Sequence, residues 1–395
     1  MRSQRVSSPR SRKNFRKTYA EDTGLFPCRS NERPDYLSGS AAESTGERRA
    51  SRTSSGSAAP PASTTLVAKK IASFCEPNKK RGCYTLCVRK LIVNADDLGL
   101  TAGVNRAIIE THIGGVVSSA TLMANGGAFE DAVTAARSAP NLSVGCHVVL
   151  VDGAPVSPPD AVDTLLAIRS AEPDKFYSSL SAFAARATLG GFDRDQLVAE
   201  VTAQIRKIQS TGLQVTHLDT HKHAHVFPEI VAALLRAARI CGVRAIRNPF
   251  VPVKAMHARQ YKGRPDLWKR YGQVRMLHTF SRQFLQRTKR AGLLTPDGVV
   301  GVIETGSVES SGFSSLLRQT LASLPEGTWE LVCHPGYDDD DLRAARTRLL
   351  DSREEERRLL TSAELRQFLE EQKIRVISYR EFAETPTEAP ATIRS

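Results

Sequence analysis

Residues 90–99 read KLIVNADDLG, an apolar run that ends in two adjacent carboxylates, and this stretch decides the fold. Its first part, Lys90–Ala95, is typical of a strand buried on both faces, because apolar side chains occupy both sides of the pleat. A loop follows, and then apolar residues at helical spacing from about Val104 to Thr111. This strand–loop–helix order indicates a parallel sheet whose strands are joined by helical crossovers.

The same alternation continues along the chain. Strand candidates lie at Lys90–Ala95, Ser119–Ala124, Ser143–Leu150, Val215–Asp219, Ala245–Arg247, Val299–Glu304, Glu330–Cys333 and Arg375–Ser378. Helical patterns separate most of them, at Phe129–Arg137, Gln196–Gln209, Pro228–Ile240 and Ser362–Glu371. Because eight strands close a β/α barrel, we expect an α/β fold in the form of an irregular (β/α) barrel over residues 89–384, in preference to an open doubly wound sheet. Long insertions at 151–192 and 251–297 follow strands, where barrels place their active-site loops.

Residues 1–88 differ in composition from the rest of the chain. They are rich in Ser, Arg, Pro and Gly, and they carry 17 Lys and Arg against 7 Asp and Glu. This extension therefore holds +10 of the net charge of +13, and the rest of the chain is nearly balanced. We expect a disordered basic extension, since it has too few apolar residues to form a core. Residues 385–395 are expected to form a short disordered tail.

Composition also disfavours several classes of protein. The longest apolar runs fall short of the roughly 20 residues that span a bilayer, and the first residues lack the apolar core of a secretory signal. The seven cysteines have no regular spacing, which predicts unpaired thiols and a cytoplasmic location. The core is not expected to bind nucleic acid, because the basic charge lies in the extension and only 6% of residues are aromatic.

The adjacent carboxylates Asp96 and Asp97 are the first candidates for chemistry. Neighbours in a strand point to opposite faces, but both side chains can reach one cavity where the strand ends and the chain turns. Hydrolysis needs two carboxylate roles, which are to hold a metal ion and to take a proton from water. One of the two could instead cap the following helix. The residues alone leave open which carboxylate takes which role.

Histidines end three further strands. His147 closes one strand, four of the nine histidines fall within residues 217–225 (HLDTHKHAH) at the end of another, and His334 precedes a Pro-Gly break after a third. A lone histidine is often a core residue, but clustered imidazoles are the usual sign of a metal site. Since the carboxyl ends of barrel strands share one face, these side chains should converge with the carboxylate pair.

A ligand set of one carboxylate and two imidazoles would leave positions open for water and substrate, as a catalytic metal site requires. Such a set suits Zn²⁺ or Mn²⁺, whereas Mg²⁺ prefers more oxygen ligands. We expect one divalent metal ion as the cofactor, with Zn²⁺ and Mg²⁺ both kept as candidates.

Four segments of the chain resemble the motifs of the YdjC-like (ChbG/HpnK) carbohydrate deacetylases. NADDLG resembles the family's N-A-D-D-F-G signature, with Leu98 in place of the usual Phe. GCHVVL is similar to its G-x-H-x-x-L segment, THLDTHKHAH to its H-x-D-x-H-x-H-x-H segment, and CHPGY to its C-H-P-G-Y segment. The order and spacing agree from about Arg89 to Glu381, and four motifs in order are far more specific than any one of them.

This resemblance implies a metal-dependent hydrolase that removes N-acetyl groups from an amino sugar of the chitooligosaccharide or glycolipid type. Matched position by position, it implies that Asp97, His147 and His221 bind the metal. Asp96 matches the general base, and His334 matches the histidine that transfers a proton to the leaving amine. We assign His223, His225 and Arg247 to substrate binding, with the two histidines as alternative metal ligands. The acetylated amino sugar is the expected partner, and a homodimer is possible.

Three other readings remain open from the residues. The same site would serve a metal-dependent amidohydrolase that acts on a non-sugar amide, because only the pocket loops would differ. The basic extension could make this a nucleic-acid-binding protein. A metal-binding protein without catalysis is a third alternative, although such a protein would need neither Asp96 nor His334.

Overall fold

A computed structural model describes residues 89–167, 174–251, 272, 275–301, 314–345 and 347–384. The expected basic extension at 1–88 and the expected tail at 385–395 lie outside the described residues, as do residues 252–271 and 273–274 of the 251–297 insertion. The residues described hold the whole set of predicted site residues and all eight predicted strands, at least in part.

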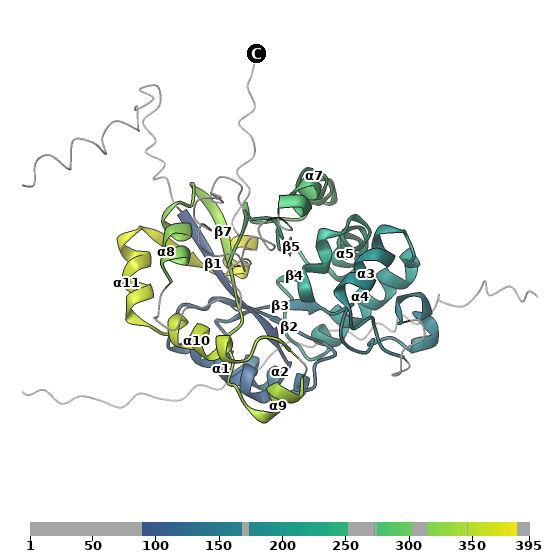
Figure 1. Ribbon diagram of the computed structural model, residues 1–395, viewed down its shortest axis with the longest axis horizontal. Coiled ribbons are helices and arrows are strands. Elements are labelled where there is room, and N and C mark those ends of the chain that lie inside the picture. The colour runs from purple at the N-terminus through teal and green to yellow at the C-terminus, as the bar shows by residue number, and fades with distance from the viewer. Residues whose placement is uncertain are drawn as a thin grey trace, which may run out of the picture. The chain divides into compact units, whose positions relative to one another are not determined.

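The centre of the structure is a parallel sheet of eight strands, which confirms the predicted strand number (Figure 1). The strands are β1 (Arg89–Leu98), β2 (Ser119–Leu122), β3 (Ser143–Val148), β4 (His217–Thr220), β5 (Ala245–Ile246), β6 (Gly298–Val300), β7 (Gly327–Cys333) and β8 (Ile374–Ile377). Strands β2 to β6 are buried along their whole length, as expected for a sheet that is covered by helices.

The sheet curls into a half-barrel with the strand order β5-β4-β3-β2-β1-β7-β6. One edge of β1 pairs with β7. The other edge pairs with β8 in the first half of the strand and with β2 in the second half. The two outer strands approach each other, because the amide of Val299 in β6 donates to the carbonyl of Phe250 just after β5, at 3.1 Å. The predicted irregular (β/α) barrel is therefore confirmed, and the shared edge of β1 is the source of its irregularity.

Helices join the strands and cover the sheet. They are α1 (Ala102–Ile113), α2 (Phe129–Ser138), α3 (Leu180–Thr188), α4 (Arg194–Ser210), α5 (Pro228–Cys241), α7 (Ser281–Ala291), α8 (Ser315–Ala322), α9 (Asp340–Ala344), α10 (Asp351–Leu360), α11 (Ala363–Glu371) and α12 (Tyr379–Glu384). In Figure 1, α8, α10 and α11 lie beside β1 and β7, whereas α3, α4 and α5 lie on the side of β3–β5. None of the helices in the described ranges is long and apolar enough to cross a membrane.

Local sequence explains where many helices begin and end. The side chain of Asp193 accepts hydrogen bonds from the first amides of α4, and those of Thr101 and Ser362 do the same for α1 and α11. Helix α5 starts with Pro228, whose missing N–H costs nothing in the first turn, and ends at Gly242 in the left-handed conformation. These ends lie within two residues of the predicted ones for most of the expected helices.

The interior of the sheet is partly polar, and one glycine makes room for it. A Cβ atom at Gly145 in β3 would lie 2.5 Å from the imidazole ring of His217 in β4. That ring cannot move aside, because it stacks on Tyr379 with 3.6 Å between ring centroids and is hydrogen-bonded to Thr216 and Asn94. Glycine is therefore required at this position by close packing and not by a backbone turn.

We predict that Gly145→Ala lowers the free energy of unfolding by about 1–3 kcal/mol, the usual cost of overpacking a filled core. Urea unfolding followed by circular dichroism measures the change. Gly127→Ala is the matched control, because a Cβ atom there meets only the carbonyl of Leu100 at 3.7 Å. Equal stability of the two variants would show that the His217 ring is not held in place.

Candidate active site

A β-bulge brings Asp96 and Asp97 to the same side of the sheet. Ala95 pairs with Ala120 and Leu98 pairs with Leu122, so two residues of β1 stand opposite a single residue of β2. Asp97 has a left-handed φ of 67°, which is uncommon outside glycine and marks a conformation imposed by its surroundings. The strand that was predicted to end at Ala95 thus continues to Leu98. The bulge, and not a strand end, allows adjacent side chains to share one site.

Three of the predicted metal ligands form a nearly equilateral triangle. Oδ1 of Asp97 lies 3.3 Å from Nε2 of His147 and 3.2 Å from Nδ1 of His221, and the two imidazole nitrogens are 3.3 Å apart. Two ligand atoms that each lie about 2.1 Å from one ion are separated by roughly 3.0–3.4 Å at octahedral or tetrahedral angles. The triangle therefore has the dimensions that a single divalent ion requires.

The side chains around the triangle leave these three atoms free for an ion. Oδ1 of Asp97 is buried and receives no hydrogen bond within the part of the chain that the structure describes. His147 is directed by Asp219 in β4, whose Oδ1 accepts from Nδ1 of that ring at 2.8 Å. A histidine held in this way presents its other nitrogen to the metal. The donor atoms and their surroundings thus fit a divalent ion.

The same contacts control the protonation of the ligands. Burial opposes a charge on His147, but Asp219 and the other nearby carboxylates overcome it and raise the pKa of the imidazole to about 10. Burial likewise opposes a charge on Asp97, and the Arg353 guanidinium, with Nη2 at 2.6 Å from Oδ2, holds the pKa of that carboxyl well below its usual range. Without an ion, the triangle therefore contains an ionised carboxylate beside a protonated imidazole.

Asp96 lies next to the triangle and is bound by a different arginine. Both of its oxygens accept from Arg247, at 2.8 and 2.6 Å, and Oδ1 also accepts from Asn94 at 3.0 Å. Burial acts to raise the pKa of Asp96, but Arg247 outweighs it and keeps this carboxyl ionised. Asp96, His147 and Asp219 form a second group of possible ligand atoms, but both of its carboxylates are already paired with Arg247.

The guanidinium of Arg247 is completely buried and connects three strands. It contacts Asp96 of β1, Asp219 of β4 and Glu330 of β7, each at 2.6–2.8 Å. Glu330 in turn accepts from the hydroxyl of Tyr379 at 2.5 Å. These contacts support a positioning role for Arg247. The substrate contact that was expected for it stays a prediction.

His334 follows β7 and faces Asp96. Its Nε2 lies 3.8 Å from Oδ2 of Asp96, and its Nδ1 has no hydrogen-bond partner among the residues described. Burial lowers the pKa of His334 to about 4 despite the nearby carboxylates, so the ring is neutral near pH 7. The structure therefore brings the predicted base and the predicted proton-transferring histidine together at the edge of the metal triangle.

The remaining histidines of the cluster have separate places. His217 is a buried structural residue that links Thr216 to Asn94. His225 is also buried and bonds to the hydroxyl of Thr220 at 2.6 Å, whereas His223 is only partly covered. Burial lowers the pKa of both, and His223 is lowered to about 3, so these rings are neutral. Their predicted contact with substrate stays a prediction.

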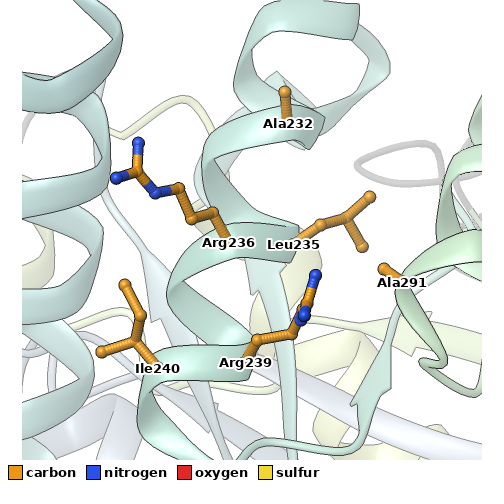
Figure 2. A pocket seen from close by; sticks show the side chains of 6 residues that line it. All are labelled: Ala232, Leu235, Arg236, Arg239, Ile240 and Ala291. Carbon is orange, nitrogen blue, oxygen red and sulfur yellow. The ribbon is translucent and has the colours of Figure 1, made fainter.

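A surface hollow of about 640 Å³ lies on the outer side of α5, away from these side chains (Figure 2). It is lined by Ala232, Leu235, Arg236, Arg239, Ile240 and, at the end of α7, Ala291. None of these side chains carries a carboxylate or an imidazole, so the hollow lacks the groups that hydrolysis needs.

Comparison with known proteins places the chain in a family. The profile of the YdjC-like protein family matches residues 90–371, which include every member of the metal triangle and both Asp96 and His334. The chain belongs to the YdjC-like family. A carbohydrate deacetylase of Brevibacillus brevis is 30% identical over 74% of this chain and 99% of the relative. Another carbohydrate deacetylase, from Thermoanaerobacter pseudethanolicus, is 29% identical over 74% of this chain and 98% of its own length.

A solved structure agrees with the YdjC-like fold. The crystal structure of a candidate cellobiose-phosphate cleavage protein from Enterococcus faecalis V583 has a TM-score of 0.59 and 25% sequence identity. The match covers 75% of this chain and 99% of that protein. The resemblance that the four motifs indicated is therefore confirmed at the level of family and fold.

The structure adds site residues that the sequence interpretation missed. Asp219 stood inside the histidine motif without a role, and it orients His147. Arg353 and Glu330 contact Asp97 and Arg247, but nothing in the local sequence marked them. An ionisable residue in an apolar strand, such as Glu330 in WELVC, was the one available signal.

We predict that His147→Ala and His221→Ala each abolish stoichiometric metal binding, because two ligands remain where three are needed. Elemental analysis after dialysis against Zn²⁺ measures the metal content. His112→Ala is the control, since that imidazole bonds to the carbonyl of Val117 outside the site. Full occupancy in either ligand variant would remove that histidine from the metal shell.

We also predict that metal affinity rises with pH. The metal needs a deprotonated Nε2 on His147, whereas the ion-free protein keeps that ring protonated up to about pH 10. Each pH unit below 10 should therefore weaken binding about tenfold, with one proton released per ion. Calorimetric titration in buffers of different ionisation enthalpy counts the released protons. Release of no proton between pH 7 and 8 would contradict the protonated state of His147.

Proposed function

We propose that this protein is a metal-dependent N-deacetylase that hydrolyses the acetamido group of an amino sugar. The observation that carries the proposal is the triangle of Asp97, His147 and His221 beside two further acid–base groups, Asp96 and His334. The relatives named as carbohydrate deacetylases, which match over nearly their full length, support a sugar as the substrate.

A divalent ion in the triangle would polarise the acetyl carbonyl and lower the pKa of water, which is the chemistry that amide hydrolysis needs. Two imidazoles and one carboxylate favour Zn²⁺ or a similar ion over Mg²⁺, although we keep Mg²⁺ as an alternative. The charge around the site also favours a cation. Once His147 has released its proton, the three carboxylates of Asp96, Asp97 and Asp219 face the two cations of Arg247 and Arg353.

The protein's own residues move the proton. Asp96 is ionised and takes a proton from water as the water oxygen bonds to the acetyl carbon. Neutral His334 cannot serve as a strong acid until it gains a proton, and Asp96 is 3.8 Å away and able to pass one on. His334 then protonates the amine nitrogen as the C–N bond breaks. Acetic acid and the free amine leave and become acetate and the ammonium form by exchange of the second water proton, and both residues return to their starting states.

Fixed contacts keep Asp96 in place during these steps. The fork of Arg247 holds both of its oxygens, and the amide of Asn94 holds one of them from the side. The strong pairing makes Asp96 a weak base, so its contribution depends on orientation more than on basicity. Because the Asp96 side chain is already fixed, little further conformational entropy is lost when it takes the proton.

One alternative keeps the same chemistry with a different substrate. A non-sugar amide would use the same triangle, and the loops that would decide this lie partly outside the described residues. Release of acetate from a panel of N-acetylated sugars and glycolipids, compared with simple amides, separates the two. A cytoplasmic location and a homodimer stay predictions, and binding of nucleic acid would depend on residues 1–88.

We predict that Asp96→Asn and Asp97→Asn fail in different ways. Asp96→Asn should keep its metal and lose turnover by about 10²–10⁴-fold, the usual cost of a missing general base. Asp97→Asn should instead bind metal weakly, because a neutral amide is a poorer ligand, and excess metal should partly restore its activity. Acetate release as a function of metal concentration, measured side by side, makes the comparison.

The opposite pattern would reverse the two roles. If added metal restores Asp96→Asn and has no effect on Asp97→Asn, then Asp96 holds the ion. Wild-type turnover in both variants would end the proposed mechanism. Asp339→Asn controls for charge loss, since this carboxylate caps α9 outside the site.

A further inference from the structure

Two side chains of helix α10 contact residues of the candidate active site, one at Asp97 and the other at His334. Arg353, one of its first residues, is 1% exposed and donates from Nη2 to Oδ2 of Asp97 at 2.6 Å. Glu356, one turn later on the same face, accepts from the backbone N–H of His334 at 2.5 Å. The helix is itself tied to the strand end, because the carbonyl of Arg353 accepts from the amide of Gly336 at 3.2 Å.

The contact with Arg353 gives the two oxygens of the Asp97 carboxylate different surroundings. Oδ2 is occupied by the guanidinium, whereas Oδ1 points into the triangle and receives no hydrogen bond from the residues described. A carboxylate can otherwise bind a cation through one oxygen or two, and large ions such as Ca²⁺ accept both modes. With Oδ2 engaged, only one oxygen of Asp97 is available.

We propose that Arg353 and Glu356 of α10 are positioning residues, Arg353 restricting Asp97 to one metal-binding oxygen and Glu356 fixing His334. The inference rests on the proposed metal-dependent function and extends it. Arg353 contacts Asp97 through Oδ2 and not through Oδ1, and Glu356 contacts the backbone of His334, so each acts through the residue that it holds. One helix face thereby sets both the metal ligand and the proton donor.

The direction in which metal affinity changes when Arg353 is removed distinguishes a positioning role from electrostatic repulsion. Arg353 is a cation close to a cation site, so its removal would strengthen metal binding if electrostatic repulsion were its main influence. If it orients Asp97, its removal weakens binding by about 10–100-fold, as for other groups that orient a metal ligand. Freedom of Asp97 to use both oxygens should also change ion selectivity in favour of larger ions.

The test is a calorimetric titration of the full-length protein with Zn²⁺ and with Ca²⁺. For Arg353→Met we expect a 10–100-fold loss of Zn²⁺ affinity and a smaller loss, or none, for Ca²⁺. Arg353→Lys should lie between this variant and the wild type, because an ammonium keeps the charge but lacks the planar fork. If Arg353→Met fails to fold, the Zn²⁺ affinity of Arg353→Lys tests the proposal in its place. The control is Arg358→Met, since that side chain is 64% exposed and pairs only with Glu354 among the described residues.

Unchanged or tighter Zn²⁺ binding in the folded Arg353 variants would overturn the role of Arg353. Failure of the wild type to bind either ion would instead reject the metal-dependent function itself, so the two failures are distinguishable.

The second arm concerns Glu356. Glu356→Met removes the acceptor for the His334 N–H and should lower kcat at least tenfold with Zn²⁺ affinity and KM nearly unchanged. Glu356→Gln keeps an acceptor oxygen and should restore most of the turnover. Equal kcat in Glu356→Met and wild type would remove Glu356 from the positioning set, and loss of Zn²⁺ affinity in Glu356→Met would show that its role is general to the fold.

Discussion

The buried guanidinium of Arg247 is the contact on which the interior of this fold depends. Three carboxylates enter the same space from β1, β4 and β7, and an unpaired charge in that space would cost several kcal/mol. Arg247 satisfies all three at once, and burial raises the pKa of Glu330 to about 7, which removes part of the remaining charge. The interior of the sheet can therefore hold charged side chains, which an apolar core could not accommodate.

Each functional group next to this network is fixed on one side and free on the other. Asp219 holds one nitrogen of His147 and leaves Nε2 free, and Arg353 holds one oxygen of Asp97 and leaves Oδ1 free. The free atoms are the ones that meet in the triangle. Because the orienting contacts are themselves buried, the ligand atoms keep their separation without an ion. A site arranged beforehand in this way would need little reorganisation energy to bind the proposed metal ion.

The charges around His147 also favour exchange of its proton for a metal ion. His147 must carry a proton to coexist with the carboxylates around it, and a divalent ion can take over that role. Burial keeps His334 neutral beside an ionised Asp96, so in the proposed mechanism the pair begins with one carboxylate able to accept a proton and one imidazole able to pass it on. Two neighbouring groups with opposite environments are typical of acid–base partners in enzymes.

Much of this protein could be predicted from its sequence, because the deciding signals are local. Apolar runs of four to eight residues alternate with helical patterns, which specifies parallel strands and crossovers, and polar residues at the ends of four strands mark one face of the sheet. Other features arise only from tertiary structure. The bulge at Asp96 and Asp97 follows from pairing with β2, so the strand does not end where its apolar residues end. Arg247 follows β5 directly, where a loop begins, yet its side chain is buried against carboxylates 28 to 151 residues away. Arg353 reaches Asp97 across 256 residues, and no pattern along the chain records an ion pair between groups so far apart.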